Sequence, residues 1–306
     1  MTVCVAAICD NNNSIVTASD MMLSYDSFSA DLAVKAMQIH PNWQALFAGN
    51  VSACWPILRE AKARSVTREN TVEQVKASCR EAYGNQFQRY ITHKVLVRYG
   101  FDLESFKENG LKQLGRDVFN SLCRQIDQIN FDCEFLICGF DKDKNPHIFT
   151  VSNPGIATEH SPPGFYAIGS GEFSALSTLV FHRFKSGMQL ARGIYHVCEA
   201  KFMAESAVGV GSPTNALIIH NSGDLELVDS RLIEEIKDAW TLEGKARVPS
   251  GIEETIKSKL AGESPTQIRH LSIFHSRSFD YWSCNAFSKV SKPPKSPVQA
   301  TRSSIR

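Results

Sequence analysis

The start of the chain constrains the fold more than any other segment. An apolar run over 3–8 follows Thr2 directly, and an Asn-rich turn over 10–13 separates it from a second run over 14–19. β-Branched residues favour strands, whereas Asn tolerates the left-handed backbone that tight turns require. The pattern therefore predicts two consecutive strands joined by a turn.

The rest of the chain predicts strands and helices in alternating groups. Apolar residues recur with the period of a helix over 51–61 and 72–90, and Thr71 and Gln74 form a capping-box pattern before the second of these helices. We expect further strands at 43–47, 135–140, 147–151, 216–220 and 225–228, and further helices within 100–130, 173–184 and 190–201. Two stacked sheets with helices on both outer faces would bury every apolar face, so the predicted fold class is α+β.

Composition narrows the classes of partner. The chain has 306 residues, of which 43% are hydrophobic and 21% are charged, and its net charge is +1. A net charge so close to zero gives no electrostatic basis for binding nucleic acid or a membrane surface. No apolar run approaches the ~18 residues of a membrane helix, and the N-terminal run lacks the basic segment of a targeting signal. We therefore expect a soluble, cytoplasmic protein with no nucleic-acid or membrane partner.

The cysteine and histidine patterns predict neither a metal site nor a cofactor. The nine cysteines include no C-x-x-C pair, and the nine histidines include no H-E-x-x-H motif. Asp141, Asp143 and Asn145 match the start of a calcium loop, but its central Gly and closing Glu are absent, so we expect a hairpin turn there. The odd number of cysteines indicates reduced thiols.

Thr2 is the first candidate catalytic residue. An initiator Met before a small residue is normally removed, which would leave Thr2 with a free α-amine. A hydroxyl is nearly inert at neutral pH, but an α-amine with a pKa of about 7.7–8.0 can accept its proton, directly or through a water. Thr2 would then supply both a nucleophile and a general base.

Several short motifs follow Thr2 in a fixed order. They are Ser19-Asp20 at the end of the second strand, Lys35, a strand ending in Phe47-Ala-Gly49, the segment Cys138-Gly-Phe-Asp141, and Gly169-Ser-Gly171. In this order and spacing they resemble the proteasome β-subunit family, including its bacterial relatives of the ClpY-partner peptidase type and the ancestral-β-subunit type. The resemblance implies the four-layer αββα sandwich of the N-terminal-nucleophile (Ntn) hydrolases.

The resemblance also implies a role for each motif residue. Thr2 would be the nucleophile, Lys35 would favour the unprotonated amine and the developing alkoxide, and Asp20 would keep Lys35 charged and in place. The backbone N–H of Gly49 would stabilise the oxyanion, and the Ser170 hydroxyl would support the α-amine. Taken alone, Asp20 and Lys35 would be interpreted as a surface ion pair, and Gly49 as a turn glycine.

One segment departs from the family pattern. Active β-subunits have Asp-x-x-Ser-Gly where this chain has Glu205-Ser-Ala-Val208-Gly. Glu205 keeps a carboxylate that is one methylene longer, so it is retained as a candidate catalytic residue. Val208 supplies no hydroxyl, and Ser206 occupies a different backbone position. On the substrate side, Phe47 and Trp55 are expected to line an apolar specificity pocket beside the nucleophile.

Three functions remain open at this point. The leading hypothesis is a threonine-type peptidase that cleaves peptide or amide substrates inside a homo-oligomer, with an unfoldase or activator as a partner. The alternatives are a hydrolase of a small-molecule amide on the same fold and a catalytically inactive, proteasome-like structural subunit. Retention of the five motif residues favours an enzyme, whereas the altered segment 205–208 favours the structural subunit.

The chain is expected to divide into three parts. Residues 1–230 would form the Ntn-hydrolase domain, with a helical insertion over about 100–130, and residues 231–275 would form a C-terminal extension that is helical in part. Residues 276–306 are expected to be a disordered basic tail, because the sequence over 286–306 is rich in Lys, Arg and Pro and contains no acidic residue.

Overall fold

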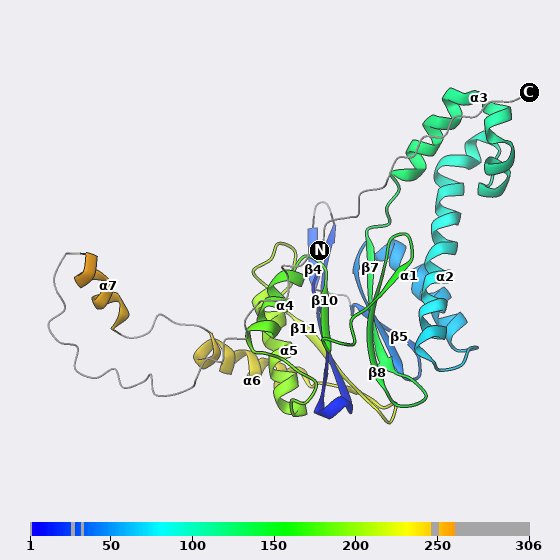
Figure 1. The fold of residues 1–306 in the computed structure, drawn as a ribbon. Helices are drawn as coiled ribbons and strands as arrows, with labels where there is room; N and C mark the ends of the chain where they lie inside the picture. Colours follow the sequence, from blue (N-terminus) through cyan, green and yellow to red (C-terminus); the bar gives the residue numbers. More distant parts are fainter. Residues whose placement is uncertain (1, 26–27, 32–33, 246–250, 261–306) are drawn as a thin grey trace, which may run out of the picture. The chain divides into compact units, whose positions relative to one another are not determined.

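The computed structural model describes residues 2–25, 28–31, 34–245 and 251–260. These residues form helices and antiparallel sheets, so the fold is a mixture of α and β structure, as predicted (Figure 1). The strands are β1 (Cys4–Cys9), β2 (Ser14–Asp20), β3 (Met22–Tyr25), β4 (Phe28–Asp31), β5 (Ala36–His40), β6 (Trp43–Gly49), β7 (Cys133–Phe140), β8 (Pro146–Ser152), β9 (Ile156–Glu159), β10 (Phe165–Ile168), β11 (Thr214–His220) and β12 (Leu225–Leu227).

Two five-stranded sheets make up most of the β structure. The first has the strand order β10-β1-β2-β11-β12 and the second has the order β5-β6-β7-β8-β9, while β3 and β4 pair separately. In the first sheet, Cys4 of β1 lies opposite Ser19 of β2 and Ile168 of β10. The register therefore brings the residue before β1, the end of β2 and the end of β10 to the same edge of the first sheet.

Both faces of β1 are buried, and each face belongs to a different cluster. Successive side chains of a strand point to opposite faces. Val5 and Ala7 accordingly pack with residues of α4 (Glu172–Phe181) and α5 (Leu190–Ala204). Ala6 and Ile8 pack instead against residues of β6, β7 and β8. The first sheet is thus covered by helices on one face and by the second sheet on the other.

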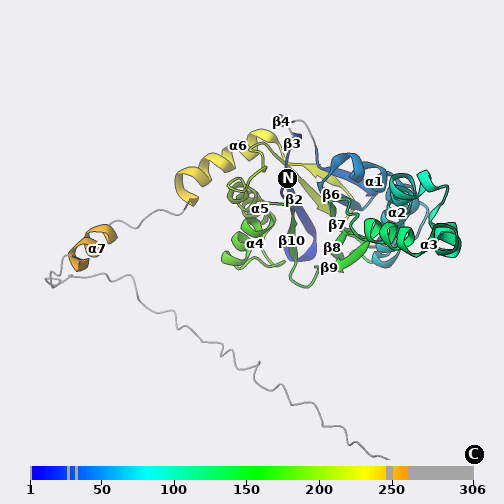
Figure 2. The same cartoon turned by 90° about the horizontal axis from the view of Figure 1, so that it is seen from above.

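The second sheet repeats this arrangement on its own outer face. Phe47 of β6 and Phe135 of β7 pack with Ile57 and Leu58 of α1 (Val51–Ser65) and with Tyr83 of α2 (Val72–Ile91). Figures 1 and 2 show α1 and α2 on one side of the two sheets and α4 and α5 on the other. The expected elements are confirmed, and α2 begins as predicted, since the Thr71 side chain accepts a hydrogen bond from the Gln74 N–H at 3.3 Å.

The stretch expected to be a helical insertion contains α3 (Leu103–Asp127). It begins at Asp102, whose side chain accepts the Ser105 N–H at 2.7 Å in a capping box, and its helical backbone is interrupted at Gly115. With the end of α2 it forms a separate apolar cluster, which includes Phe106 and Leu122. None of the described helices is long and apolar enough to cross a membrane.

The chain divides into two compact units, Met1–Lys245 and Ala246–Arg306. The first unit extends beyond residue 230 because Ile233 of α6 (Ser230–Ala239) and Trp240 join the cluster that α4 and α5 form on the first sheet. In the second unit, the described segment is α7 (Ile252–Leu260). The tail predicted over 276–306 lies outside the described residues.

Candidate active site

Thr2, Asp20 and Lys35 lie together at the edge of the first sheet. Thr2 precedes β1, Asp20 ends β2 and Lys35 precedes β5 of the second sheet. Lys35 Nζ donates hydrogen bonds to Thr2 Oγ1 and to both carboxylate oxygens of Asp20, the latter at 2.9 and 2.8 Å, while the Thr2 hydroxyl donates to Asp20 Oδ1. All three residues are buried. The three residues are distant from one another in the sequence, and the fold brings them into one hydrogen-bonded triad.

Asp20 is held by the backbone as well as by Lys35. Its Oδ1 accepts the N–H of Val3 at 2.9 Å, and its Oδ2 accepts the N–H groups of Met22 at 3.0 Å and Gly211 at 3.2 Å. Burial alone would raise the pKa of this carboxyl, but hydrogen bonds from Lys35 and Thr2, the Lys35 charge and the Val3 N–H outweigh burial and lower the pKa. Asp20 is therefore a fixed anion that orients the Lys35 ammonium toward the Thr2 hydroxyl.

Ser170 contacts the backbone nitrogen of Thr2. The Thr2 N–H donates to Ser170 Oγ at 3.2 Å, and Ser170 Oγ lies 3.2 Å from the carbonyl oxygen of Thr2 and 3.1 Å from that of Val208. Gly169 allows this approach, because it has a φ of +92° and a Cβ there would lie 2.4 Å from the Thr2 carbonyl oxygen. The Gly-Ser-Gly motif thus places the Ser170 hydroxyl within hydrogen-bond distance of the Thr2 nitrogen, which would become the α-amine once Met1 is removed.

Gly49 ends β6 beside the triad. Its φ is +102°, and a Cβ at this position would lie 1.6 Å from the carbonyl oxygen of Asp132. Gly49, Thr2, Lys35 and Ser170 all line one cleft of about 1090 Å³. Four of the predicted catalytic residues therefore line a cavity large enough for part of a peptide or for a small amide, whereas Asp20 and Glu205 do not line it.

Phe47 and Trp55 occupy different positions relative to this cleft. Phe47 is buried and lines the cleft. Trp55 packs edge-on against Phe47, with ring centroids 5.7 Å apart, and is not among the lining residues. The cleft wall also carries Asn50, Ser52 and other polar side chains, so it is less apolar than the sequence predicted.

Glu205 does not contact Thr2. Its carboxylate pairs with Lys201 at 2.7 Å and with Lys237 at 2.9 Å. Lys201 is fully buried and also donates to the carbonyl oxygens of Ser212 and, at 2.9 Å, Gly211. The Gly211 N–H in turn donates to Asp20, so a series of contacts connects Glu205 to Asp20 through Lys201 and Gly211. Burial lowers the pKa of Lys201 although Glu205 opposes the shift.

The structure adds Glu134 to the cleft. It lies on β7 opposite Ala48, and the described residues form no ion pair with it. Burial and then the negative charge of Glu172 raise the pKa of its carboxyl, while the Gly169 N–H partly offsets them. The sequence could have indicated Glu134, because it is an acidic residue within the apolar strand at 133–140. Lys201 is likewise a charged residue within the apolar stripe of α5.

The neighbouring thiol of Cys4 is not a competing nucleophile. It lies on β1 with no exposed surface, and its Sγ contacts the carbonyl oxygen of Phe47 at 3.4 Å. Burial raises its pKa to about 12 even though the Lys35 charge lowers it. Of these two groups, the Thr2 hydroxyl, which contacts Lys35 and Asp20, is therefore the candidate nucleophile.

Comparisons with known proteins assign no family to the chain. No family model matches the sequence, and no curated protein matches it.

Proposed function

We propose that this protein is a threonine-type Ntn hydrolase of the proteasome β type, which cleaves peptide or amide bonds with Thr2 as its nucleophile. The observation that carries the proposal is the Thr2 hydroxyl hydrogen-bonded to the buried Lys35–Asp20 pair inside the cleft. The two sheets and their outer helices support the finer assignment, the four-layer αββα sandwich of Ntn hydrolases.

The proposed reaction has two steps. After removal of Met1, the α-amine of Thr2 accepts the hydroxyl proton, directly or through a water, as Oγ1 attacks the substrate carbonyl carbon. The Gly49 N–H stabilises the oxyanion, the C–N bond then breaks, and the proton passes from the α-amine to the leaving amine. A water molecule, deprotonated by the same amine, then attacks the carbonyl carbon of the resulting ester. The bond between that carbon and Oγ1 breaks, the amine returns the proton to Oγ1, and the carboxylic acid product leaves.

Lys35, Asp20 and Ser170 assist these steps without changing covalently. The Lys35 ammonium lies against Oγ1, where negative charge develops, and stabilises the alkoxide. Asp20 holds that ammonium with two hydrogen bonds. Ser170 contacts the Thr2 nitrogen at 3.2 Å and orients the amine. Both the peptidase and the small-amide hydrolase hypotheses use this chemistry, and the 1090 Å³ cleft accommodates either substrate.

The inactive-subunit hypothesis is retained as the second candidate because one observation favours it. Glu205, which replaces the family carboxylate, pairs with Lys201 and Lys237 instead of the nucleophile. The side chain of Val208 is 76% exposed and offers no hydroxyl. A homo-oligomer, with an unfoldase or activator partner, and a cytoplasmic location remain part of the proposal. The described cysteines are all free thiols, which suits a reducing compartment.

The proposal is tested by mass spectrometry and by two matched variants. Intact-mass analysis of active protein should show Thr2 as the first residue. Thr2→Ala should abolish hydrolysis of fluorogenic peptide and amide panels and labelling by a threonine-directed electrophile. Ser52→Ala is the control, because Ser52 is an exposed hydroxyl residue lining the same cleft, and it should retain both activities. Retained Met1 in active material, or equal hydrolysis by Thr2→Ala and wild type, would refute Thr2 as an N-terminal nucleophile.

A further inference from the structure

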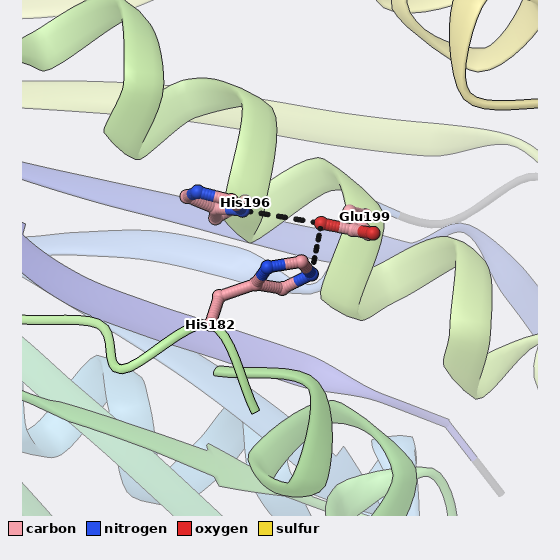
Figure 3. A group of neighbouring side chains, drawn as sticks. All are labelled: His182, His196 and Glu199. Atoms are coloured by element: carbon pink, nitrogen blue, oxygen red, sulfur yellow. Dashed lines mark hydrogen bonds and ion pairs between the residues drawn. The ribbon is translucent and has the colours of Figure 1, made fainter. Parts of the chain in front are cut away.

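A second cluster of ionisable side chains lies between α4 and α5. Figure 3 shows that His196 and Glu199 project from α5 and that His182 approaches them from the segment after α4. His196 and Glu199 are three residues apart, so they lie on the same face of the helix. None of the three residues lines the cleft that holds Thr2, and the cluster is thus separate from the proposed active site.

Two imidazole nitrogens in the cluster are directed at the same carboxylate oxygen. Nε2 of His182 lies 3.0 Å and Nδ1 of His196 lies 3.1 Å from Glu199 Oε2. One ligand atom from each residue lies within 4.8 Å of the other two. A tetrahedral Zn²⁺ with bonds of about 2.0–2.2 Å places its ligand atoms about 3.3–3.6 Å apart. The two imidazole–carboxylate spacings are therefore close to those that such an ion imposes.

The cluster is mostly buried, but one of its three side chains is open to solvent. The side chains of His196 and Glu199 are each 7% exposed, whereas that of His182 is 27% exposed. An anion on a mostly buried wall beside a half-open imidazole provides both a binding site and an entry path.

We propose that His182, His196 and Glu199 bind one divalent transition-metal ion, with Zn²⁺ as the preferred ion. Two imidazole nitrogens and one carboxylate are a donor set of Zn²⁺ sites, and an open fourth position on the exposed side of His182 would hold water. Ca²⁺ and Mg²⁺ prefer all-oxygen shells, so they should bind poorly here. The H-E-x-x-H criterion missed this site because its ligands come from two different segments.

Metal binding changes the tautomers of the two imidazoles. In the metal-free cluster each imidazole can donate an N–H to Glu199, whereas a bound ion needs the lone pairs of His182 Nε2 and His196 Nδ1. The proton then resides on the other ring nitrogen. For His196 this is Nε2, which is buried and has no partner among the described residues. The contacts of the two imidazoles with Glu199 are then replaced by bonds to the ion. Because no acceptor among the described residues supports the Nε2–H of His196, we expect weaker binding than at a fully supported zinc site.

The structural consequence is a link between two helices. His182 is the C-cap residue of α4, and the other two ligands lie on α5, so the ion would join the end of one helix to the middle of the next. Since the ion would bind the native state more tightly than the unfolded chain, it should raise the unfolding temperature, and the rise should grow with the Zn²⁺ concentration relative to Kd. This inference does not depend on hydrolysis by Thr2.

The test measures Zn²⁺ alone, on the full chain. Wild type, His182→Ala, Glu199→Gln and His220→Ala are stripped with chelator and titrated against a chromophoric chelator. His220→Ala is the matched control, because His220 also pairs with a glutamate, Glu226 at 3.1 Å, but belongs to no three-ligand group in the described residues. We expect one equivalent bound by wild type and by His220→Ala, and at least a tenfold loss of affinity in the other two variants.

Cobalt distinguishes this site from thiol binding. Co²⁺ bound by imidazole and carboxylate should give weak visible bands without the intense near-ultraviolet band of thiolate ligation. Thermal unfolding of each metal-free variant confirms that it is folded, and Zn²⁺ should raise the unfolding temperature of wild type and His220→Ala only. Absence of stoichiometric binding, equal affinity in all four proteins, or a thiolate band with Co²⁺ would each overturn the proposal.

Discussion

Replacing Lys35 by Met provides the sharpest test of the buried triad. Met has nearly the length of the lysine stem and removes only the ammonium. Lys35 is 3% exposed and Asp20 has no exposed surface, so solvent cannot replace the lost charge. The variant leaves Asp20 as a buried anion whose remaining partners are the Thr2 hydroxyl and the N–H groups of Val3, Met22 and Gly211.

The expected loss of stability follows from this geometry. Removing one partner of a buried ion pair costs about 3–5 kcal/mol, because it leaves an uncompensated charge. The three backbone N–H groups still solvate Asp20, so we expect a value near the lower end, about 3 kcal/mol. Lys142→Met is the control, since Lys142 pairs with Glu69 on the surface, where both side chains are at least half exposed. Screening by solvent should leave that variant close to wild type.

The pH dependence has a definite sign. In wild type the lowered pKa of Asp20 contributes stability that is present above the unfolded value, about 3.9, and is lost as the pH falls through the folded value. Without Lys35, burial dominates and raises that pKa. Protonation of Asp20 then relieves the unpaired charge, so the difference in stability between Lys35→Met and wild type should shrink as the pH falls from 7 toward 4.

Urea denaturation followed by circular dichroism at several pH values measures these quantities. The same samples should show no hydrolysis by Lys35→Met, because the alkoxide of Thr2 loses its stabilising charge. A stability change at pH 7 no larger than that of Lys142→Met would refute the buried pair. A difference that grows as the pH falls would refute the assigned sign.

Three further variants probe the rest of the cleft. Glu134→Gln should match wild type near pH 4 and be more stable above pH 7, because the raised pKa of Glu134 makes its charge costly as the pH rises; urea denaturation at both pH values checks this. Gly49→Ala should fold poorly and lose all hydrolysis, since its Cβ would lie 1.6 Å from the Asp132 carbonyl oxygen; thermal unfolding and the amide panel report the loss, and native stability would contradict it. Val208→Ser should leave the unfolding temperature unchanged and hydrolysis unchanged or higher, because its side chain is 76% exposed; a fall in kcat/KM would count against this.

The sequence predicted the central strands of the sheets better than the edge strands β9 and β10. Strands such as β1, β2, β6 and β7 are long and apolar, so period and composition identified them. β9 has mostly exposed side chains and β10 is short, and neither produces a strong periodic pattern. β9 pairs with β8, the preceding strand, whereas β10 pairs with β1, which is distant in sequence. Local propensity cannot supply such long-range pairings.

In the candidate site, too, the sequence predicted some residues correctly and others only in part. Thr2, Asp20, Lys35 and Ser170 were identified by their order along the chain, and the structure brings them into contact. Glu205 was chosen because it occupies the position of a family carboxylate, but its longer side chain lies against two lysines. A sequence motif gives the order of residues along the backbone, whereas the direction of a side chain depends on which charged groups the fold places nearby.

This redirected carboxylate still connects to the triad. Glu205 neutralises Lys201, whose ammonium is fully buried and would otherwise be costly to keep charged. Lys201 binds the carbonyl oxygen of Gly211, and the N–H of the same residue binds Asp20. Loss of Glu205 should therefore loosen this glycine and weaken one of the three backbone contacts that hold Asp20, without removing a group from the cleft. Lys35 and Lys201, both buried, then have distinct roles, because Lys35 contacts the Thr2 hydroxyl whereas Lys201 binds the backbone of Gly211, which donates to Asp20, the counter-ion of Lys35.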